Sequence, residues 1–218
     1  MKNKKIFALL LCAVFAVTVS VLASGCSQEK DSPPPSGQSG QSSQSGQSGQ
    51  SAQNAGGSDT GTAAELGSLK SFSAGTLDGG TFTQDDIAAK DVTAINFWSL
   101  TCGPCIIEMP DLAAFAAALP ENVQLVTVCL DGLGNEETAK SILEESGFTG
   151  VTLISGDGDL AALCGNLMYT PTTIFADAGG SLIGDAVIGG QEDLSGTFLA
   201  AVNKVLVESG KAEISLEE

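Results

Sequence analysis

Hydrophobic and polar residues divide this 218-residue chain into three regions. A continuous apolar run occupies residues 6–23, directly after a short basic segment. Residues 27–64 contain almost no large apolar side chain and are rich in serine, glycine and glutamine. Between residues 65 and 218 the apolar residues return in short runs that are separated by polar turns. This last region is long enough to bury a hydrophobic core, so it predicts one folded domain.

Within this domain the pattern alternates between the spacing of strands and the spacing of helices. Residues 92–98 form a continuous apolar run, which is typical of a buried strand, whereas residues 194–208 repeat apolar side chains with a helical period. We expect strands over residues 72–77, 81–83, 92–98, 123–130, 151–154, 172–176 and 182–188, and helices over residues 84–89, 102–119, 136–146, 160–164 and 194–208. Alternating strands and helices that end in a hairpin and a helix predict an α/β sandwich on a mixed sheet.

Turn and cap residues mark the ends of several of these elements. Asp78-Gly79-Gly80 separates the first two strands and predicts a hairpin turn. Gly147 follows the 136–146 segment and is a typical C-terminal cap of a helix. Pro110 lies inside the predicted 102–119 helix, which it should bend because proline has no N–H to donate.

The first 25 residues have the features of an export signal. A basic start, an apolar run and small residues lead to Cys26. The end of this segment resembles the bacterial lipobox, which implies cleavage before Cys26 and diacylation of its sulfur. An uncleaved transmembrane anchor is the alternative, because the apolar run is at the lower limit of spanning length. Both interpretations place the rest of the chain outside the cytoplasm, and the first predicts a lipid anchor in the cell membrane.

Residues 26–64 are predicted to be the lipidated cysteine followed by a disordered tether. Three prolines are followed by repeats of Ser-Gly-Gln. With almost nothing apolar to bury, such a segment cannot offset the entropy lost on ordering. The predicted organisation is therefore a signal peptide (1–25), a lipidated tether (26–64) and one domain (65–218).

The composition excludes several kinds of chemistry. The chain has 26 acidic and nine basic residues, a net charge of −17, and the basic residues are all lysine. Without histidine, Ser-His-Asp and Cys-His catalysis and His-ligated zinc or haem sites are impossible. A chain this acidic would also repel nucleic acid. The six cysteines are therefore the most informative residues.

Cys102-Gly103-Pro104-Cys105 directly follows a predicted buried strand and opens a predicted helix. This spacing brings two sulfurs within disulfide reach, and the setting is typical of a redox motif. The free N–H groups of the first helical turn stabilise a thiolate at Cys102. A purely structural disulfide is a weaker interpretation, because so short a loop gains little from closure.

Two further cysteines of the domain, Cys129 and Cys164, have three open roles. They are inert buried thiols, partners in a second disulfide, or a relay that takes oxidation from the first pair. A zinc site formed with Cys102 and Cys105 is a fourth reading. The absence of a second C-x-x-C and of histidine argues against it, so no metal is expected.

Residues 96–110, NFWSLTCGPCIIEMP, resemble the active-site segment of TlpA/ResA-type thiol-disulfide oxidoreductases, a membrane-anchored branch of the thioredoxin superfamily. The resemblance extends from about Phe72 to Val207 and includes Thr170-Pro171-Thr172-Thr173. It implies a thioredoxin-like fold with an N-terminal β-hairpin extension and a central helix–strand insertion. It also implies an enzyme without a cofactor, apart from its own Cys102–Cys105 disulfide or dithiol.

The resemblance implies a role for each residue of the reacting group. Cys102 would be the attacking thiolate and Cys105 the buried resolving thiol. Glu108 would transfer protons to or from the cysteine pair, and an ordinary solvated helix glutamate is the alternative. One residue departs from the family pattern, because Thr101 stands where the family usually has tryptophan. This departure puts the substrate preference in doubt but leaves the exchange chemistry intact.

The same resemblance implies a substrate-binding surface. Pro171 would be a cis-proline beside the dithiol, and Thr170 would offer its backbone to a bound substrate strand. Gly103 and Pro104, which lie between the two cysteines, would complete this surface. A cis peptide bond before proline is uncommon in folded proteins, so this implication can be tested directly.

The residues near the motif favour a reductant. No cation is nearby in the sequence and Glu108 would oppose a thiolate, so we expect a reduction potential below about −180 mV. Electrons would come from a membrane thiol carrier of the CcdA/DsbD type and pass to disulfides of exported proteins, as in cytochrome c maturation or a related process. A folding oxidase and a non-catalytic binding lipoprotein are the alternatives. A peroxidase is disfavoured because its usual arginine is missing.

Overall fold

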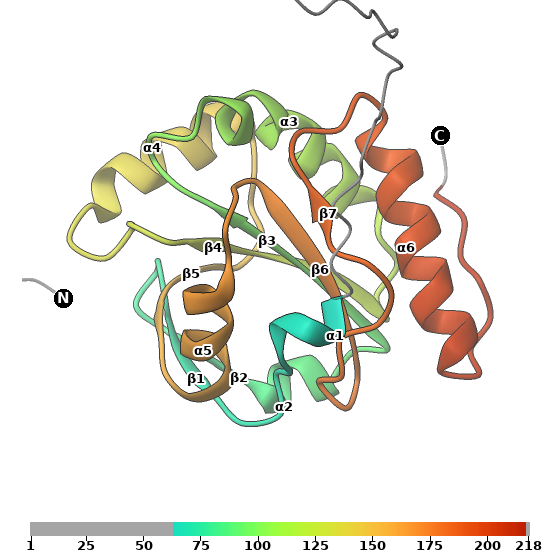
Figure 1. Ribbon diagram of the computed structural model, residues 1–218. Helices are drawn as coiled ribbons and strands as arrows, with labels where there is room; N and C mark the ends of the chain where they lie inside the picture. Colours follow the sequence, from blue (N-terminus) through green and yellow to red (C-terminus); the bar gives the residue numbers. More distant parts are fainter. Residues whose placement is uncertain (1–62, 217–218) are drawn as a thin grey trace, which may run out of the picture. The chain divides into compact units, whose positions relative to one another are not determined.

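A seven-stranded mixed β-sheet forms the centre of residues 63–216, the part of the chain that the computed structural model describes (Figure 1). The strands are β1 (Ser73–Thr76), β2 (Thr81–Thr83), β3 (Val92–Trp98), β4 (Val123–Cys129), β5 (Thr152–Gly156), β6 (Thr172–Asp177) and β7 (Val187–Ile188). The helices are α1 (Ala63–Leu66), α2 (Gln84–Ala88), α3 (Gly103–Ala118), α4 (Glu136–Ser146), α5 (Gly158–Asn166) and α6 (Leu194–Glu208). The predicted signal peptide, Cys26 and the tether up to residue 62 lie outside the described residues.

The strand order brings three segments to one end of the sheet. Across the sheet the order is β2-β1-β5-β4-β3-β6-β7. β3 runs parallel to β4, with Trp98 opposite Cys129, and antiparallel to β6, with Phe97 opposite Thr172. The carboxyl ends of β3 and β4 and the amino end of β6 therefore lie together. This end is called the carboxyl end of the sheet below.

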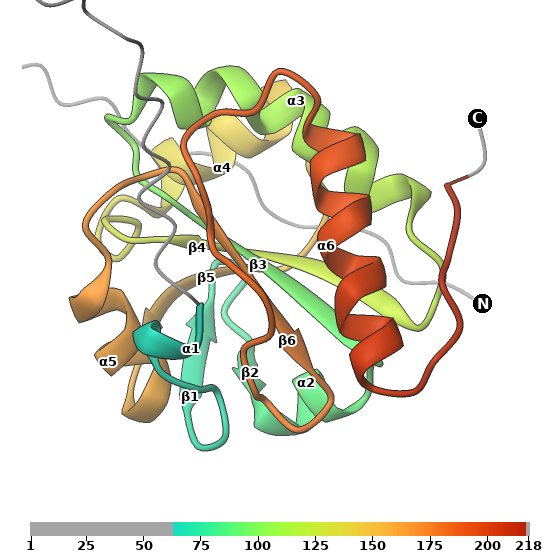
Figure 2. The same ribbon diagram turned by 45° about the vertical axis from the view of Figure 1, so that its right-hand side comes forward.

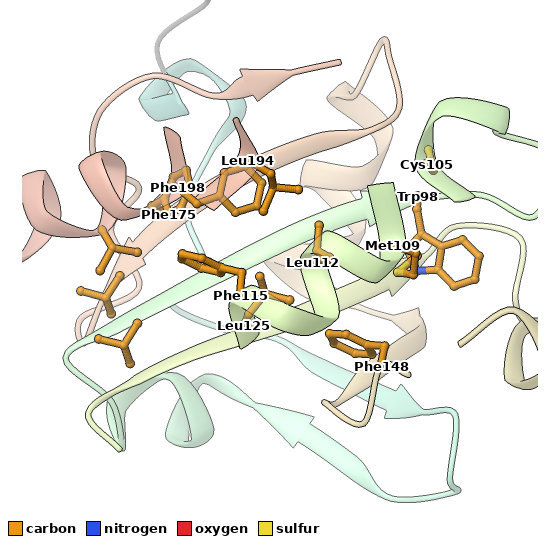
Figure 3. Close-up of a cluster of buried hydrophobic side chains, with 14 of the residues drawn as sticks. Trp98, Cys105, Met109, Leu112, Phe115, Leu125, Phe148, Phe175, Leu194 and Phe198 are labelled. Carbon is orange, nitrogen blue, oxygen red and sulfur yellow. The ribbon is translucent and has the colours of Figure 1, made fainter. Parts of the chain in front are cut away.

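Helices cover both faces of the sheet (Figures 1 and 2). On one face, α3, α4 and α6 bury a cluster that includes Phe115, Phe175 and Phe198 (Figure 3). The Phe198 ring meets each of the other two edge to face, with ring centres 5.6 Å apart. On the other face, α1, α2 and α5 pack over a second cluster. β3 is consequently buried over its whole length and provides a fixed base for the loop that follows it.

The structure confirms the predicted thioredoxin-like architecture. The β1–β2 hairpin forms the N-terminal extension, and α4 with β5 forms the central insertion, in which β5 lies parallel to β4. The strand over residues 92–98 and the helices over 136–146 and 194–208 begin and end where the pattern predicts. Gly147 caps α4 with a φ of 74°, a left-handed conformation that favours glycine. Across residues 63–216, the helices are too short or too polar to cross a bilayer.

Two elements differ most from the prediction, and the others differ only in where they begin and end. The strand expected over residues 182–188 is reduced to β7, because the chain leaves the sheet at Gly184, where φ is 79°. Leu182 keeps only an isolated bridge to Ala176. The helix α1 was not predicted, yet its Ala63 is fully buried. The folded part therefore includes residues 63 and 64, which the composition assigned to the tether. Four residues are too few for a helical period to be recognised in the sequence.

Candidate active site

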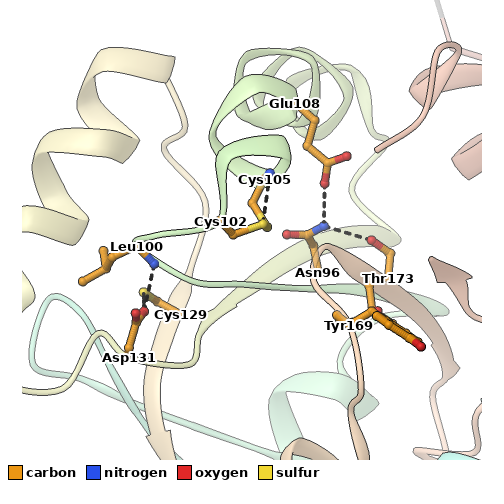
Figure 4. Close-up of a disulfide and its surroundings, with 10 residues drawn as sticks. Asn96, Leu100, Cys102, Cys105, Glu108, Cys129, Asp131, Tyr169 and Thr173 are labelled. Carbon is orange, nitrogen blue, oxygen red and sulfur yellow. Dashed lines mark hydrogen bonds between the residues drawn. A yellow bond between two sulfur atoms is a disulfide. The ribbon is translucent and has the colours of Figure 1, made fainter. Parts of the chain in front are cut away.

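Cys102 and Cys105 form a disulfide at the first turn of α3, at the carboxyl end of the sheet (Figure 4). Their Cα atoms are 5.3 Å apart. Cys102 is the N-cap residue of the helix, and its Sγ accepts a hydrogen bond from the Cys105 backbone N–H over 3.2 Å. The Cys102 sulfur therefore faces the electropositive helix terminus, which would stabilise its thiolate after reduction.

The two sulfurs differ in access. Cys105 is fully buried, whereas Cys102 is half-buried and is followed by the exposed Gly103 and Pro104. A large substrate can reach only the Cys102 side of the disulfide. This asymmetry fits the predicted division into an attacking and a resolving cysteine.

The loop that leads into Cys102 is held by the strand beside it. The Leu130 N–H donates to the Trp98 carbonyl over 2.9 Å. The Leu100 N–H donates to Asp131 Oδ1 over 2.9 Å (Figure 4). The Cys102 N–H closes a turn onto the Ser99 carbonyl. Asp131 is a site residue that the sequence motifs did not predict. Its position two residues after β4, at the same end of the sheet as the motif, is the signal that could have found it.

Glu108 is buried, with 6% of its surface exposed, so the alternative of a solvated helix glutamate is wrong. Asn96 Nδ2 donates to Glu108 Oε1 over 3.2 Å and also to Thr173 Oγ1 over 3.0 Å (Figure 4). Glu108 belongs to α3, Asn96 to β3 and Thr173 to β6, so this buried network joins three elements near the disulfide (Figure 4).

The surroundings of Glu108 keep its carboxyl group close to half-ionised at neutral pH. Burial raises its pKa, and so does the negative charge of Asp111, whereas hydrogen bonds from Asn96 and from the Gln191 backbone lower it. Burial is the largest of these influences, and the pKa is raised to about 7. A group with such a pKa can both accept and release a proton at physiological pH, which is what the predicted proton transfer requires.

The Thr170–Pro171 peptide bond is cis, as the family resemblance implies. Pro171 is buried and immediately precedes Thr172, which pairs with Phe97 of β3. The Gly189 N–H donates to the Pro171 carbonyl over 2.8 Å, which ties this loop to the end of β7. Pro171 and the half-buried Thr170 therefore lie at the same end of the sheet as Cys102. Their contact with a substrate stays a prediction.

The other two cysteines of the domain are not bonded to each other. Both line one cavity of about 260 Å³ between β4, β5 and α5. Burial, with the neighbouring Asp131, raises the pKa of Cys129 to about 12, and Cys129 Sγ lies 3.6 Å from Asp131 Oδ1. A thiol this hard to ionise is a poor relay for oxidation. Among residues 63–216, no three histidine, cysteine or acidic side chains are grouped to hold a metal ion.

We expect Cys129 to resist alkylation by iodoacetamide in the folded, oxidised protein at pH 8 and to react once the protein is denatured. Only about one part in ten thousand of a thiol with this pKa is thiolate at pH 8. Peptide mapping without reductant measures the alkylation of Cys129 in the folded and in the denatured protein. Rapid labelling of native Cys129, or a peptide linked by a Cys129–Cys164 disulfide, would contradict the inert role.

Together these features define the class of protein. A thioredoxin-like domain with a C-x-x-C disulfide at a helix terminus, beside a cis-proline, is a thiol-disulfide oxidoreductase of the thioredoxin superfamily. The model of the family described as Redoxin matches residues 48–195, and the chain belongs to this family.

Solved structures of related proteins have the same fold. DsbF of Mycobacterium tuberculosis (MTB), in mixed oxidised and reduced forms, is 26% identical, with a TM-score of 0.52 over 63% of this chain and 96% of its own. A DsbF homologue of Corynebacterium diphtheriae is 18% identical, with a TM-score of 0.53 over 69% of this chain and 95% of its own. The thioredoxin domain of a thiol-disulfide oxidoreductase of Bacteroides vulgatus is 22% identical, with a TM-score of 0.51 over 63% and 97%. A search of curated proteins gave no significant match.

Proposed function

We propose that this thiol-disulfide oxidoreductase is a membrane-anchored reductase of disulfides in exported proteins. The observation that carries the proposal is the asymmetric disulfide at the start of α3, in which Cys102 is accessible and Cys105 is fully buried. Such a pair can act on a protein-sized substrate through one sulfur and release it through the other.

The reaction consists of two exchanges of sulfur partners. In the reduced enzyme the Cys102 thiolate attacks one sulfur of the client disulfide, and the other client sulfur leaves as a thiolate. Cys105 then loses its proton and attacks the Cys102 sulfur, so that the enzyme disulfide forms again and the second client thiolate leaves. Two electrons pass from the enzyme to the client. Glu108 would accept the Cys105 proton, and solvent protonates the client thiolates.

The charges near the disulfide support the reducing direction. Asp131 lies beside the loop before Cys102, and Glu108 lies about one helical turn after Cys105 on α3. Both acids disfavour a thiolate when they are ionised, so the helix terminus is left as its main stabiliser. A less stable thiolate makes the disulfide the preferred state and lowers the reduction potential, by about 30 mV for each 1.4 kcal/mol.

The proposed location and electron source rest on the N-terminal sequence. Cleavage before Cys26 and acylation of its sulfur would leave the domain on a tether at the outer face of the cell membrane. A membrane thiol carrier of the CcdA/DsbD type would then supply the electrons. Disulfides of exported proteins, including those reduced for cytochrome c maturation, would be the clients.

Reduction of insulin by the full chain, with dithiothreitol as the electron source, tests this proposal. We expect the wild type to shorten the lag before the free B chain precipitates, and Cys102→Ser to remain at the uncatalysed rate. Cys164→Ser, which changes a cysteine away from the active pair, should keep wild-type activity. No acceleration by the wild type would overturn the proposed activity. A potential above about −180 mV against glutathione would reverse the proposed direction.

A further inference from the structure

Large apolar side chains are exposed around the active-site disulfide. Ile107 and Met168 are 80% and 82% exposed, and Leu133 and Ile188 are also exposed. Ile107 follows Cys105 on α3, Leu133 lies in the β4–α4 loop, Met168 precedes the cis-proline, and Ile188 lies opposite Thr172. All four therefore lie at the carboxyl end of the sheet. Exposed apolar side chains gathered in one region mark an interaction surface rather than a core.

The four chain segments that hold these side chains contain no basic residue, and three of them contain acids. Residues 99–111, 129–135, 167–172 and 187–195 contain no lysine, and the whole chain has no arginine or histidine. Residues 167–172 are uncharged, and the other three segments contain the buried Glu108 and also Asp111, Asp131, Glu192 and Asp193. Three of these acids, Asp111, Glu192 and Asp193, line one hollow of about 200 Å³ between α3 and the start of α6.

Three of the five lysines among residues 63–216 are held away from these four segments. Lys211 pairs with Asp91 over 3.0 Å, and Lys90 donates to the Glu121 carbonyl over 2.7 Å, both next to the amino end of β3. Lys90 and Lys140 line one cavity of about 590 Å³ together with residues that precede β5. Among residues 63–216, lysine is thus absent from the four segments around the disulfide, and the charged residues that these segments contain are all acidic.

We propose that this surface selects client segments in which the reactive cysteine lies among apolar and basic residues. The inference rests on the proposed function and names its substrate class. The apolar side chains would contact the apolar part of the client, while the acids attract its lysines and arginines and repel acidic segments. Complementary charge of this kind acts mainly on the rate of association, by about 10- to 1000-fold at low salt. It weakens as the Debye length falls to about 8 Å at physiological ionic strength.

Three fluorogenic disulfide peptides test this inference. They share length and apolar residues and differ only in the four residues that flank the cysteine, which are lysine, glutamine or glutamate. We expect kcat/KM of the full chain to be at least about tenfold higher for the lysine peptide than for the glutamate peptide at low salt, and the ratio to shrink towards one in 0.5 M salt. Equal values at low salt, or a preference for glutamate, would overturn the inference.

A pair of charge variants locates the effect. Glu192→Lys should reduce the preference for the lysine peptide several-fold. Glu144→Lys changes the net charge equally but lies in the cavity with Lys90 and Lys140, so it should leave the preference nearly unchanged. Equal effects of both variants would assign the preference to the net charge of the protein. They would overturn the proposal that this surface selects the clients. If none of the peptides is reduced while insulin is, peptide binding and this inference fail; if insulin is not reduced either, the proposed function itself fails.

The apolar part of the surface has its own variant. Ile107→Ser should lower kcat/KM for all three peptides by a similar factor, at low and high salt alike, because it removes an uncharged contact. The reduction potential of this variant should equal that of the wild type. An unchanged kcat/KM for every peptide would show that the apolar side chains do not contribute to client binding.

Discussion

Replacing Cys105 by serine is expected to turn the enzyme into a covalent trap for its clients. Cys102 remains accessible at the N-cap of α3 and can still attack a client disulfide. Serine at the fully buried position 105 cannot resolve the mixed disulfide that results. With the full chain in stoichiometric amounts, we expect an adduct visible on a non-reducing gel. Resolution of the adduct by the enzyme itself should fall by at least about a thousandfold, as is typical for loss of a nucleophile.

Two other cysteine-to-serine variants are the controls for this prediction. Cys102→Ser should form no adduct, because the one remaining sulfur of the pair is buried. Cys164→Ser should turn over as the wild type does and accumulate no adduct. Mass spectrometry identifies the linked sulfur and the trapped client. An adduct on Cys105 in the Cys102→Ser variant would reverse the roles of the two cysteines.

The elements that the sequence predicted well are those whose pattern follows local physics. β3 is buried on both faces, so its apolar run is continuous, and α4 and α6 have helical periods with clear ends at Gly147 and Glu208. The segment over residues 182–188 has the composition of a strand. Its pairing is interrupted where Gly184 turns out of the sheet, and this depends on neighbours that are distant in sequence.

A similar division applies to the site. The C-x-x-C motif is a local signal, and the cis bond at Pro171 could be inferred from its resemblance to a family motif. The burial of Glu108 could not be inferred, since it follows the largely exposed Ile107 on α3. It depends on Asn96 of β3 and on the loop after β7, where the Gln191 backbone donates to the carboxylate. Contacts between three separate elements produce no periodic pattern of apolar residues in the sequence.

Glu108→Gln is expected to remove a large pH dependence of stability. Glu108 has a pKa of about 7 in the folded, oxidised protein, above the 4.5 that is its ordinary value. Between these two pH values the folded protein keeps a proton that the unfolded chain has lost. The free energy of unfolding therefore falls as the pH rises through this window, by about 3 kcal/mol in total. The Gln variant has no such proton, so this fall should be absent from it.

Urea unfolding of the oxidised protein at pH 4.5, 6 and 8 measures this difference. Other acids with shifted values, Asp78, Asp91, Glu136 and Asp159, have a lowered pKa and so titrate below the window. Glu144→Gln, at an exposed position, should unfold with the wild-type pH dependence. Parallel curves for the wild type and Glu108→Gln would show that the buried carboxyl group is not titrating in this range.

The same substitution should slow the release of a client from the mixed disulfide. Below pH 7 the Glu108 carboxyl is mostly protonated and cannot accept the Cys105 proton, so the single-turnover rate of resolution in the wild type should rise through pH 7. In Glu108→Gln the rate of resolution should be lower by about 100-fold at pH 8 and should no longer rise through pH 7.

Asn96→Ala leaves the Glu108 carboxyl buried but removes a donor that lowers its pKa, so the midpoint of the rise should move to higher pH. A stability defect alone would lower the amount of active enzyme and leave that midpoint in place, which separates proton transfer from a structural role of the network.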